Sequence, residues 1–111
     1  MPMEIIYRDE VKSVIDEVLL DIPGVKGGKS WGFPAYKANN KVFLFVGGDG
    51  VSIKLPEARV QALIDASPVM TQFSPVEGTV WKQWVMISHD NADDYRQDTA
   101  LFEESMQFAA G

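Results

Sequence analysis

The chain has 111 residues, a formal net charge of −6 and no cysteine. This length predicts a single domain over residues 1–111, and 46% hydrophobic with 23% charged residues excludes an acidic disordered chain. The absence of cysteine excludes disulfides, thiolate metal sites and cysteine catalysis. The 16 acidic against 10 basic residues disfavour, taken as a total, a nucleic-acid partner.

Membrane association is not expected. The N-terminal residues lack the basic stretch and apolar core of a secretory signal. The longest apolar run, residues 42–46, is far shorter than the roughly 20 residues that span a bilayer. We therefore expect a soluble, cytoplasmic protein.

The first expected element is an amphipathic helix over residues 4–21. Its apolar residues recur at helical spacing and form one stripe: Val11, Val14, Ile15, Val18 and Ile22. Pro23 and Gly24 end the helix, because proline cannot continue it and glycine tolerates a left-handed cap.

An extended segment over residues 29–38 follows. It is interrupted by Pro34, which predicts an edge strand or a bulge, because proline lacks the N–H that a central strand needs. Asn39-Asn40 predicts a tight turn, since asparagine accepts positive φ.

The next two segments are predicted to form a hairpin. Residues 41–46 are apolar on both faces, as in a central strand, and residues 51–55 alternate between apolar and polar side chains. Between them, Gly47-Gly48-Asp49-Gly50 is the strongest hairpin signal in the chain.

A short second helix is expected to begin at Pro56, and residues 69–73 and 81–88 to form two further strands. Asp90-Asn91 predicts the N-cap of a last helix over residues 92–109. The order predicts an α+β fold: a two-layer α-β(3)-α-β(2)-α arrangement with a mainly antiparallel five-stranded sheet and the helices on one face.

Few residues suggest catalysis. His89 beside Asp90 is a possible general base, although a polar residue at a strand-to-helix junction explains it more simply. Asp90, Asp93 and Asp94 suit the positive end of a helix better than a metal site. The GGKS run at residues 27–30 lacks the upstream glycine of a phosphate-binding loop. We predict no catalytic residue, no cofactor and no metal ligand.

The charge is distributed unevenly along the chain. Residues 1–23 carry −4 and residues 90–111 carry −5, whereas residues 24–89 carry +3. Within residues 24–55, five lysines are interleaved with aromatic residues, which is typical of contact with a phosphate backbone. Lysines that protect sheet edges and aromatics that pack in the core are the simpler alternative. The candidate nucleic-acid contacts are Lys29, Lys37, Lys41, Lys54, Trp31 and Tyr36.

Four stretches resemble a known family. These are Trp31-Gly32-Phe33-Pro34, Lys41-Val42-Phe43 with Lys54-Leu55-Pro56, and a later segment containing Phe73, Pro75, Gly78, Trp84 and Val85; the last helix, with Ser105, fits as well. Together they resemble the N-terminal domain of TfoX/Sxy-type proteins and the related YjbR/MmcQ group. The resemblance covers most of residues 26–108. It implies a YjbR/secretion-chaperone-like fold and, in some members, roles in regulation, competence or DNA binding.

Three functional hypotheses follow. The first is a small, non-catalytic, bacterial-type module related to transcription or competence, which binds DNA weakly, locally and salt-sensitively through basic β-hairpins. The second is a protein-interaction or oligomerisation module, with a protein partner or a second copy of the chain, and with no role in nucleic-acid binding. An enzyme that uses His89 and Asp90 is the weakest of the three.

Overall fold

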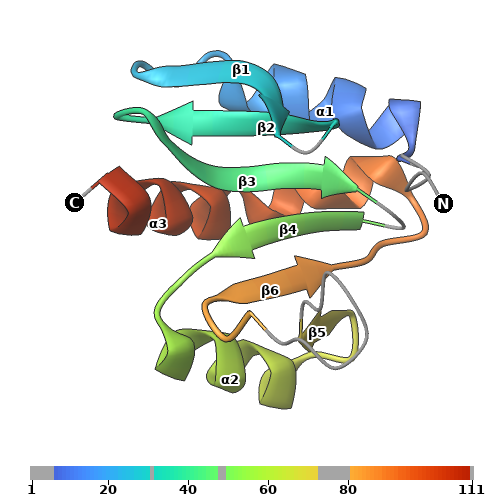
Figure 1. The fold of residues 1–111 in the computed structure, drawn as a ribbon. Helices are drawn as coiled ribbons and strands as arrows, with labels where there is room; N and C mark the ends of the chain where they lie inside the picture. The colour runs from blue at the N-terminus through green and yellow to red at the C-terminus, as the bar shows by residue number, and fades with distance from the viewer. Residues whose placement is uncertain (1–6, 31, 48–49, 73–80, 111) are drawn as a thin grey trace, which may run out of the picture.

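The computed structural model describes residues 7–30, 32–47, 50–72 and 81–110. The elements follow in the order α1 (Asp9–Leu19), β1 (Val25–Ser30), β2 (Phe33–Ala38), β3 (Lys41–Gly47), β4 (Gly50–Lys54), α2 (Glu57–Ala66), β5 (Met70–Gln72), β6 (Trp84–Ile87), the 3₁₀ helix η1 (Ala92–Asp98) and α3 (Thr99–Ala110) (Figure 1). The expected α+β class is confirmed, with three α-helices and a single sheet.

The sheet has six strands in the order β1-β2-β3-β4-β6-β5, and each neighbouring pair is antiparallel. The antiparallel prediction is confirmed, but the prediction of five strands is wrong. The segment expected as one broken strand belongs to two, because the chain reverses between β1 and β2. Gly32 lies in that reversal with a φ of +86°, a backbone conformation that glycine adopts without a steric penalty.

Several predicted boundaries shift by a few residues. The expected first helix is described from Asp9, with residues 4–6 outside the described part of the chain. The expected last helix is a 3₁₀ turn followed by α3, and the predicted cap is confirmed: the Asn91 side chain accepts from the backbone N–H of Asp93 at 3.0 Å. Asn39 and Asn40 form the predicted turn, with φ of 54° and 65°.

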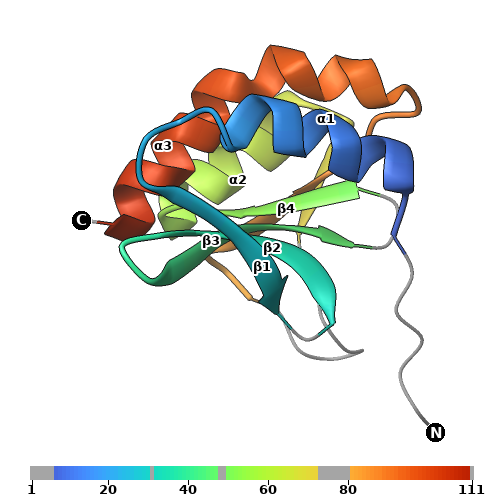
Figure 2. The same cartoon turned by 90° about the horizontal axis from the view of Figure 1, so that it is seen from above.

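The helices lie on one side of the sheet (Figure 2). Tyr36, Leu44, Ile53 and Val85 are register partners across four strands, and Tyr36 hydrogen-bonds Asp16 of α1, so this row faces the helices. We call this side of the sheet the helical face. The core between the helical face and the helices contains side chains that are each at most 1% exposed, among them Val11, Ile15, Leu19, Leu44, Ile53, Val85, Tyr95 and Phe102.

The next row of register partners, Ala35, Phe45, Ser52 and Met86, points the other way, because successive side chains of a strand alternate between faces. We call this side the outer face. It also carries Phe33 and Lys37 of β2, Lys54 of β4 and Trp84 of β6, by the same alternation.

Candidate nucleic-acid interface

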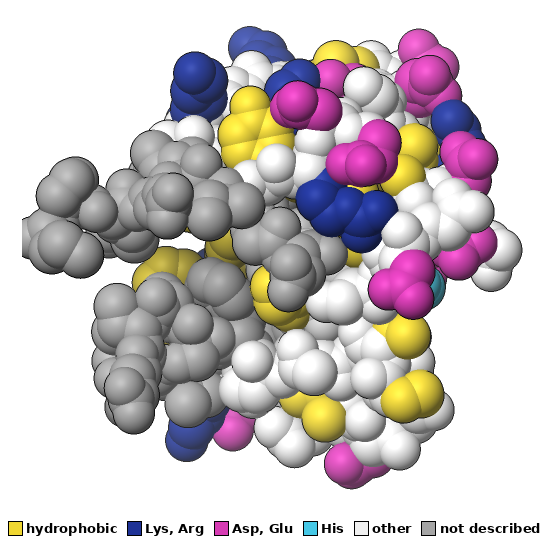
Figure 3. All heavy atoms as spheres, turned by 90° about the vertical axis from the view of Figure 1, so that its right-hand side faces the viewer, with side chains coloured by type: hydrophobic (Ala, Val, Ile, Leu, Met, Phe, Trp, Pro, Cys, Tyr) yellow, Lys and Arg dark blue, Asp and Glu magenta, His cyan; other side chains and the backbone are white. Residues whose placement is uncertain are grey.

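The strands carry the positive charge and the helices the negative charge. None of the described strand residues is acidic. Five lysines lie on the strands: Lys26, Lys29, Lys37, Lys41 and Lys54. In the edge-on view of Figure 3, acidic side chains gather over the helical side of the molecule. The charge separation seen along the sequence is therefore also a separation between layers.

The five lysines divide between the two faces. Lys26 and Lys37 are exposed register partners on the outer face, and Lys54 lies on the same face opposite Trp84. Lys29 pairs with Pro34, and Lys41 with Ala38, both positions that point to the helical side. The sheet therefore brings two of the predicted lysines, Lys37 and Lys54, onto one face, together with Lys26.

The pairing of Lys26 with Lys37 is electrostatically unfavourable. Like charges directly opposite each other on neighbouring strands destabilise a sheet. None of the ion pairs among the described residues involves either lysine. A bound anion lying over the pair would relieve this repulsion.

Four aromatic rings follow one another across the outer face, and we call them the aromatic row. Phe33 lies 6.3 Å from Phe45 between ring centroids, Phe45 lies 5.2 Å from Trp84, and Trp84 lies 6.1 Å from Trp81, just before β6. All four side chains are half-buried. The row thus joins β2, β3 and β6 across the width of the sheet.

Gly47 at the end of β3 gives Phe33 its place in this row. A Cβ at position 47 would lie 3.0 Å from the Phe33 ring, closer than ordinary van der Waals contact. Glycine therefore allows the ring to lie directly over the backbone of the neighbouring strand.

Tyr36 does not belong to this surface, although the sequence suggested it as a contact. It is 1% exposed, and its hydroxyl donates to Asp16, whose other oxygen accepts from Lys12 at 2.7 Å. Burial, then the hydrogen bond and negative charge of Asp16, raise the pKa of Tyr36 above its usual value. A buried ring cannot stack on a base, so the assignment of Tyr36 as a contact is wrong. Trp31, the other predicted aromatic contact, lies outside the described residues.

Alternation along β2 could have separated these residues in advance. Phe33 and Lys37 are four positions apart and so share a face, whereas Tyr36 falls on the other. Lys26, Phe45 and Trp84 were missed because their places on the outer face depend on strand pairing, which local sequence does not specify.

His89 has a different partner from the one expected. Its Nε2 lies 2.8 Å from Asp98 Oδ2, not beside Asp90, and both side chains are less than one-fifth exposed. Its ring packs edge-on against Tyr95, whose hydroxyl accepts from the His89 N–H and donates to the Ile87 carbonyl. These contacts hold the connection from β6 to η1 in place.

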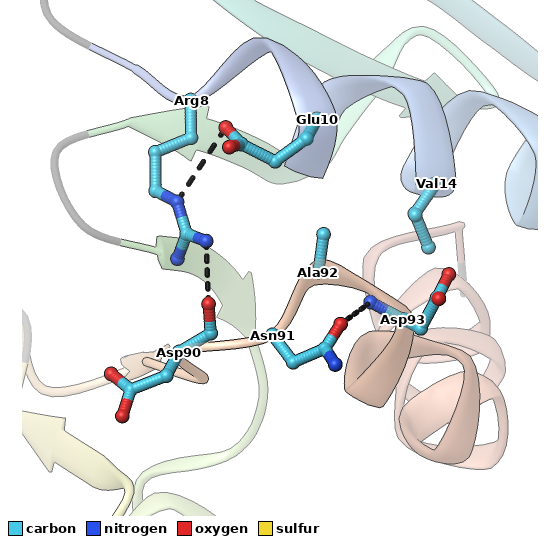
Figure 4. A pocket seen from close by; sticks show the side chains of 7 residues that line it. All are labelled: Arg8, Glu10, Val14, Asp90, Asn91, Ala92 and Asp93. Atoms are coloured by element: carbon cyan, nitrogen blue, oxygen red, sulfur yellow. Dashed lines mark hydrogen bonds and ion pairs between the residues drawn. The ribbon is translucent and has the colours of Figure 1, made fainter.

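A hollow of about 550 Å³ lies between the start of α1 and the start of η1 (Figure 4). Arg8 crosses it and donates to the carbonyls of His89 and Asp90, at 2.7 Å each, while its Nε lies 3.6 Å from Glu10. The guanidinium is thus engaged by the protein itself. Within the described part of the chain, no group of three or more histidine or acidic side chains is placed to hold a metal ion.

Ser105 of α3 connects the motif residues of β3 and β4. Its hydroxyl accepts from the Lys54 N–H at 3.1 Å, and the carbonyls of Lys54 and Phe43 lie 2.6 and 3.0 Å away as acceptors for its single proton. The β2–β3 register shift leaves Phe43 without a strand partner there, which frees its carbonyl.

Comparison with known proteins finds no counterpart: no protein-family model, curated protein or solved structure matches the chain. Among the described residues, no helix is long and apolar enough to cross a membrane.

Proposed function

We propose that the protein is a small non-catalytic module that binds nucleic acid through the lysines of its outer face. The observation that carries this proposal is that Lys26 and Lys37 lie opposite each other on the outer face, with Lys54 on the same face. No acidic side chain of the described strands accompanies them. Phosphate contacts by lysine supply most of the affinity in non-specific nucleic-acid binding.

The net charge of −6 does not oppose this proposal at close range. The described acidic side chains lie in or beside helices, away from the outer face, and exposed charges further apart than about 8–10 Å are largely screened at ordinary salt concentrations. Binding of this kind is local, weak and sensitive to salt.

The resemblance to TfoX/Sxy and YjbR/MmcQ proteins is part of this proposal. What supports it is Ser105, which joins the two strand motifs, Lys41-Val42-Phe43 and Lys54-Leu55-Pro56, through backbone hydrogen bonds. This contact packs α3 against both strand motifs, and the assignment of a role in competence or transcription rests on the resemblance alone.

The test is binding to a fluorescently labelled DNA duplex across about 50–200 mM salt, where phosphate-driven affinity falls steeply. A Lys26→Glu/Lys37→Glu variant is compared with Lys29→Glu/Lys41→Glu, which changes the net charge equally on the helical side of the strands. We expect the first variant to lose about tenfold or more in affinity at low salt and the second to lose much less.

Two results would overturn the proposal. Absence of duplex and single-strand binding at low salt would favour the protein-interaction module instead, which sedimentation would then test. Equal losses in both double variants would show that net charge, and not the outer face, determines affinity.

A further inference from the structure

The aromatic row and the lysines occupy the same face. Phe33 and Lys37 lie on one strand about 13 Å apart, at the roughly 3.3 Å rise of each strand residue. Lys54 is the register partner of Trp84 on the neighbouring strand. Rings and cations therefore alternate across the outer face, with Lys26 and Lys37 at the β1–β2 end and Lys54 beside Trp84.

This alternation suits one form of nucleic acid better than the other. In a duplex the faces of the bases are covered by their neighbours, so a flat protein surface meets only phosphates and groove edges. In a single strand the bases can be splayed apart and stacked on aromatic side chains while the phosphates meet basic ones. Half-buried rings on the outer face are therefore better suited to the second kind of ligand.

We propose that the outer face selects single-stranded nucleic acid, with bases stacking on Phe33 and Trp84 and phosphates held by Lys26, Lys37 and Lys54. This inference rests on the proposed function, whose cationic contacts it shares, and it adds the ligand's strandedness. Phe45 lies between Phe33 and Trp84 and contacts both rings. Because every base has a stackable face, the preference is for unpaired strands and not for a particular sequence.

The decisive experiment compares oligo-dT of about 16 nucleotides, within the site sizes known for single-strand-binding folds, with a duplex of equal length. Both are titrated by anisotropy at the same low salt concentration. We expect the single strand to bind at least about fivefold more tightly, which corresponds to one stacked base.

Aromatic variants separate stacking from charge. Trp84→Leu removes a ring of the row but keeps an apolar side chain, and Phe102→Leu is the matched control, an aromatic residue buried on the helical side. We expect Trp84→Leu to weaken oligo-dT binding about fivefold or more while changing duplex binding less than about twofold. Phe102→Leu should change neither affinity in the folded protein.

A second readout keeps the proposal falsifiable if Trp84→Leu fails to fold. The chain has three tryptophans, so Trp31→Phe/Trp81→Phe leaves Trp84 as the single tryptophan fluorophore. Stacking on a base would quench its emission on addition of oligo-dT, and the duplex would quench it much less.

The outcomes distinguish the two proposals. If the duplex binds as tightly as oligo-dT and affinity depends on Lys26 and Lys37, the strandedness inference is wrong and the proposed function stands. Unchanged Trp84 emission at saturating oligo-dT would exclude base stacking on Trp84 and leave the proposed function standing. If neither nucleic acid binds, both proposals fail together.

Discussion

The two faces of the sheet treat their buried polar groups differently. On the helical face, the hydroxyl of Ser105 from α3 has one donor and two carbonyl acceptors within hydrogen-bonding distance, and Tyr36 is paired with Asp16. On the outer face, the Ser52 hydroxyl is 1% exposed and has no hydrogen-bond partner among the described residues.

This contrast bears on the function proposed for the outer face. The helical face satisfies its polar atoms and fills its core, as a surface selected for stability does. The outer face keeps a buried hydroxyl without a hydrogen-bond partner among the described residues and two lysines opposite each other, and both features cost stability. Local departures from good packing and pairing of this kind gather where a protein meets a ligand.

The largest effect is expected from Ser105→Ala, which tests the helical side of the comparison. Without the hydroxyl, the Lys54 N–H and the Phe43 carbonyl lose a partner in a region closed to water. Each backbone group left unsatisfied costs about 1–3 kcal/mol, so we expect the free energy of unfolding to fall by at least that amount. Urea titration measures it, and Ser105→Thr, which keeps the hydroxyl, is the control. An unchanged free energy of unfolding would show that these hydrogen bonds contribute nothing.

The second prediction concerns pH and the hydrogen bond from buried Tyr36 to partly exposed Asp16. The pKa of Tyr36 is raised in the folded protein, so above pH of about 10 the unfolded chain releases this proton while the folded chain keeps it. The stabilisation is complete below that pH and is lost as the pH rises further. We expect the free energy of unfolding to fall by up to about 1.4 kcal/mol per pH unit from this group.

Tyr36→Phe should remove that part of the dependence. Urea titrations at neutral and alkaline pH measure it, and Tyr7→Phe, which keeps Tyr36 in place, is the control. If Tyr36→Phe and the unmodified protein lose stability in parallel at high pH, the raised pKa does not contribute.

Some features of the fold could be predicted because they depend only on residues that are close together in the sequence. The Asn39-Asn40 turn and the Asn91 cap depend on a few neighbouring residues and are confirmed. The sixth strand was missed because the chain reverses at Gly32, inside a segment where Pro34 suggested an edge strand or a bulge. A single positive φ, which residue identity permits but does not require, decides between one strand and two.

The candidate site shows the same limit more strongly. Lysines and aromatics in residues 24–55 pointed to the strands β1 to β4, but Tyr36 is in the core and Lys29 with Lys41 point to the helical side. Trp84 joins Phe33 and Phe45 only through the pairing of β6 with β4, two strands distant in sequence. Pairing of this kind is a property of the whole sheet.

The smallest effect, and one of opposite sign, is expected from Ser52→Ala on the outer face. The Ser52 hydroxyl is buried and has no partner in the part of the chain that the structure describes, so its removal relieves a desolvation cost while leaving a cavity no larger than one oxygen atom. We expect the free energy of unfolding to rise by about 1 kcal/mol, where Ser105→Ala lowers it. If both substitutions destabilise equally, the two faces do not differ in how they satisfy buried serines, and the argument that the outer face gives up stability loses its clearest support. If Ser52→Ala stabilises the fold and leaves oligo-dT binding unchanged, the cost of burying the Ser52 hydroxyl arises from packing of the aromatic row and not from contact with the ligand.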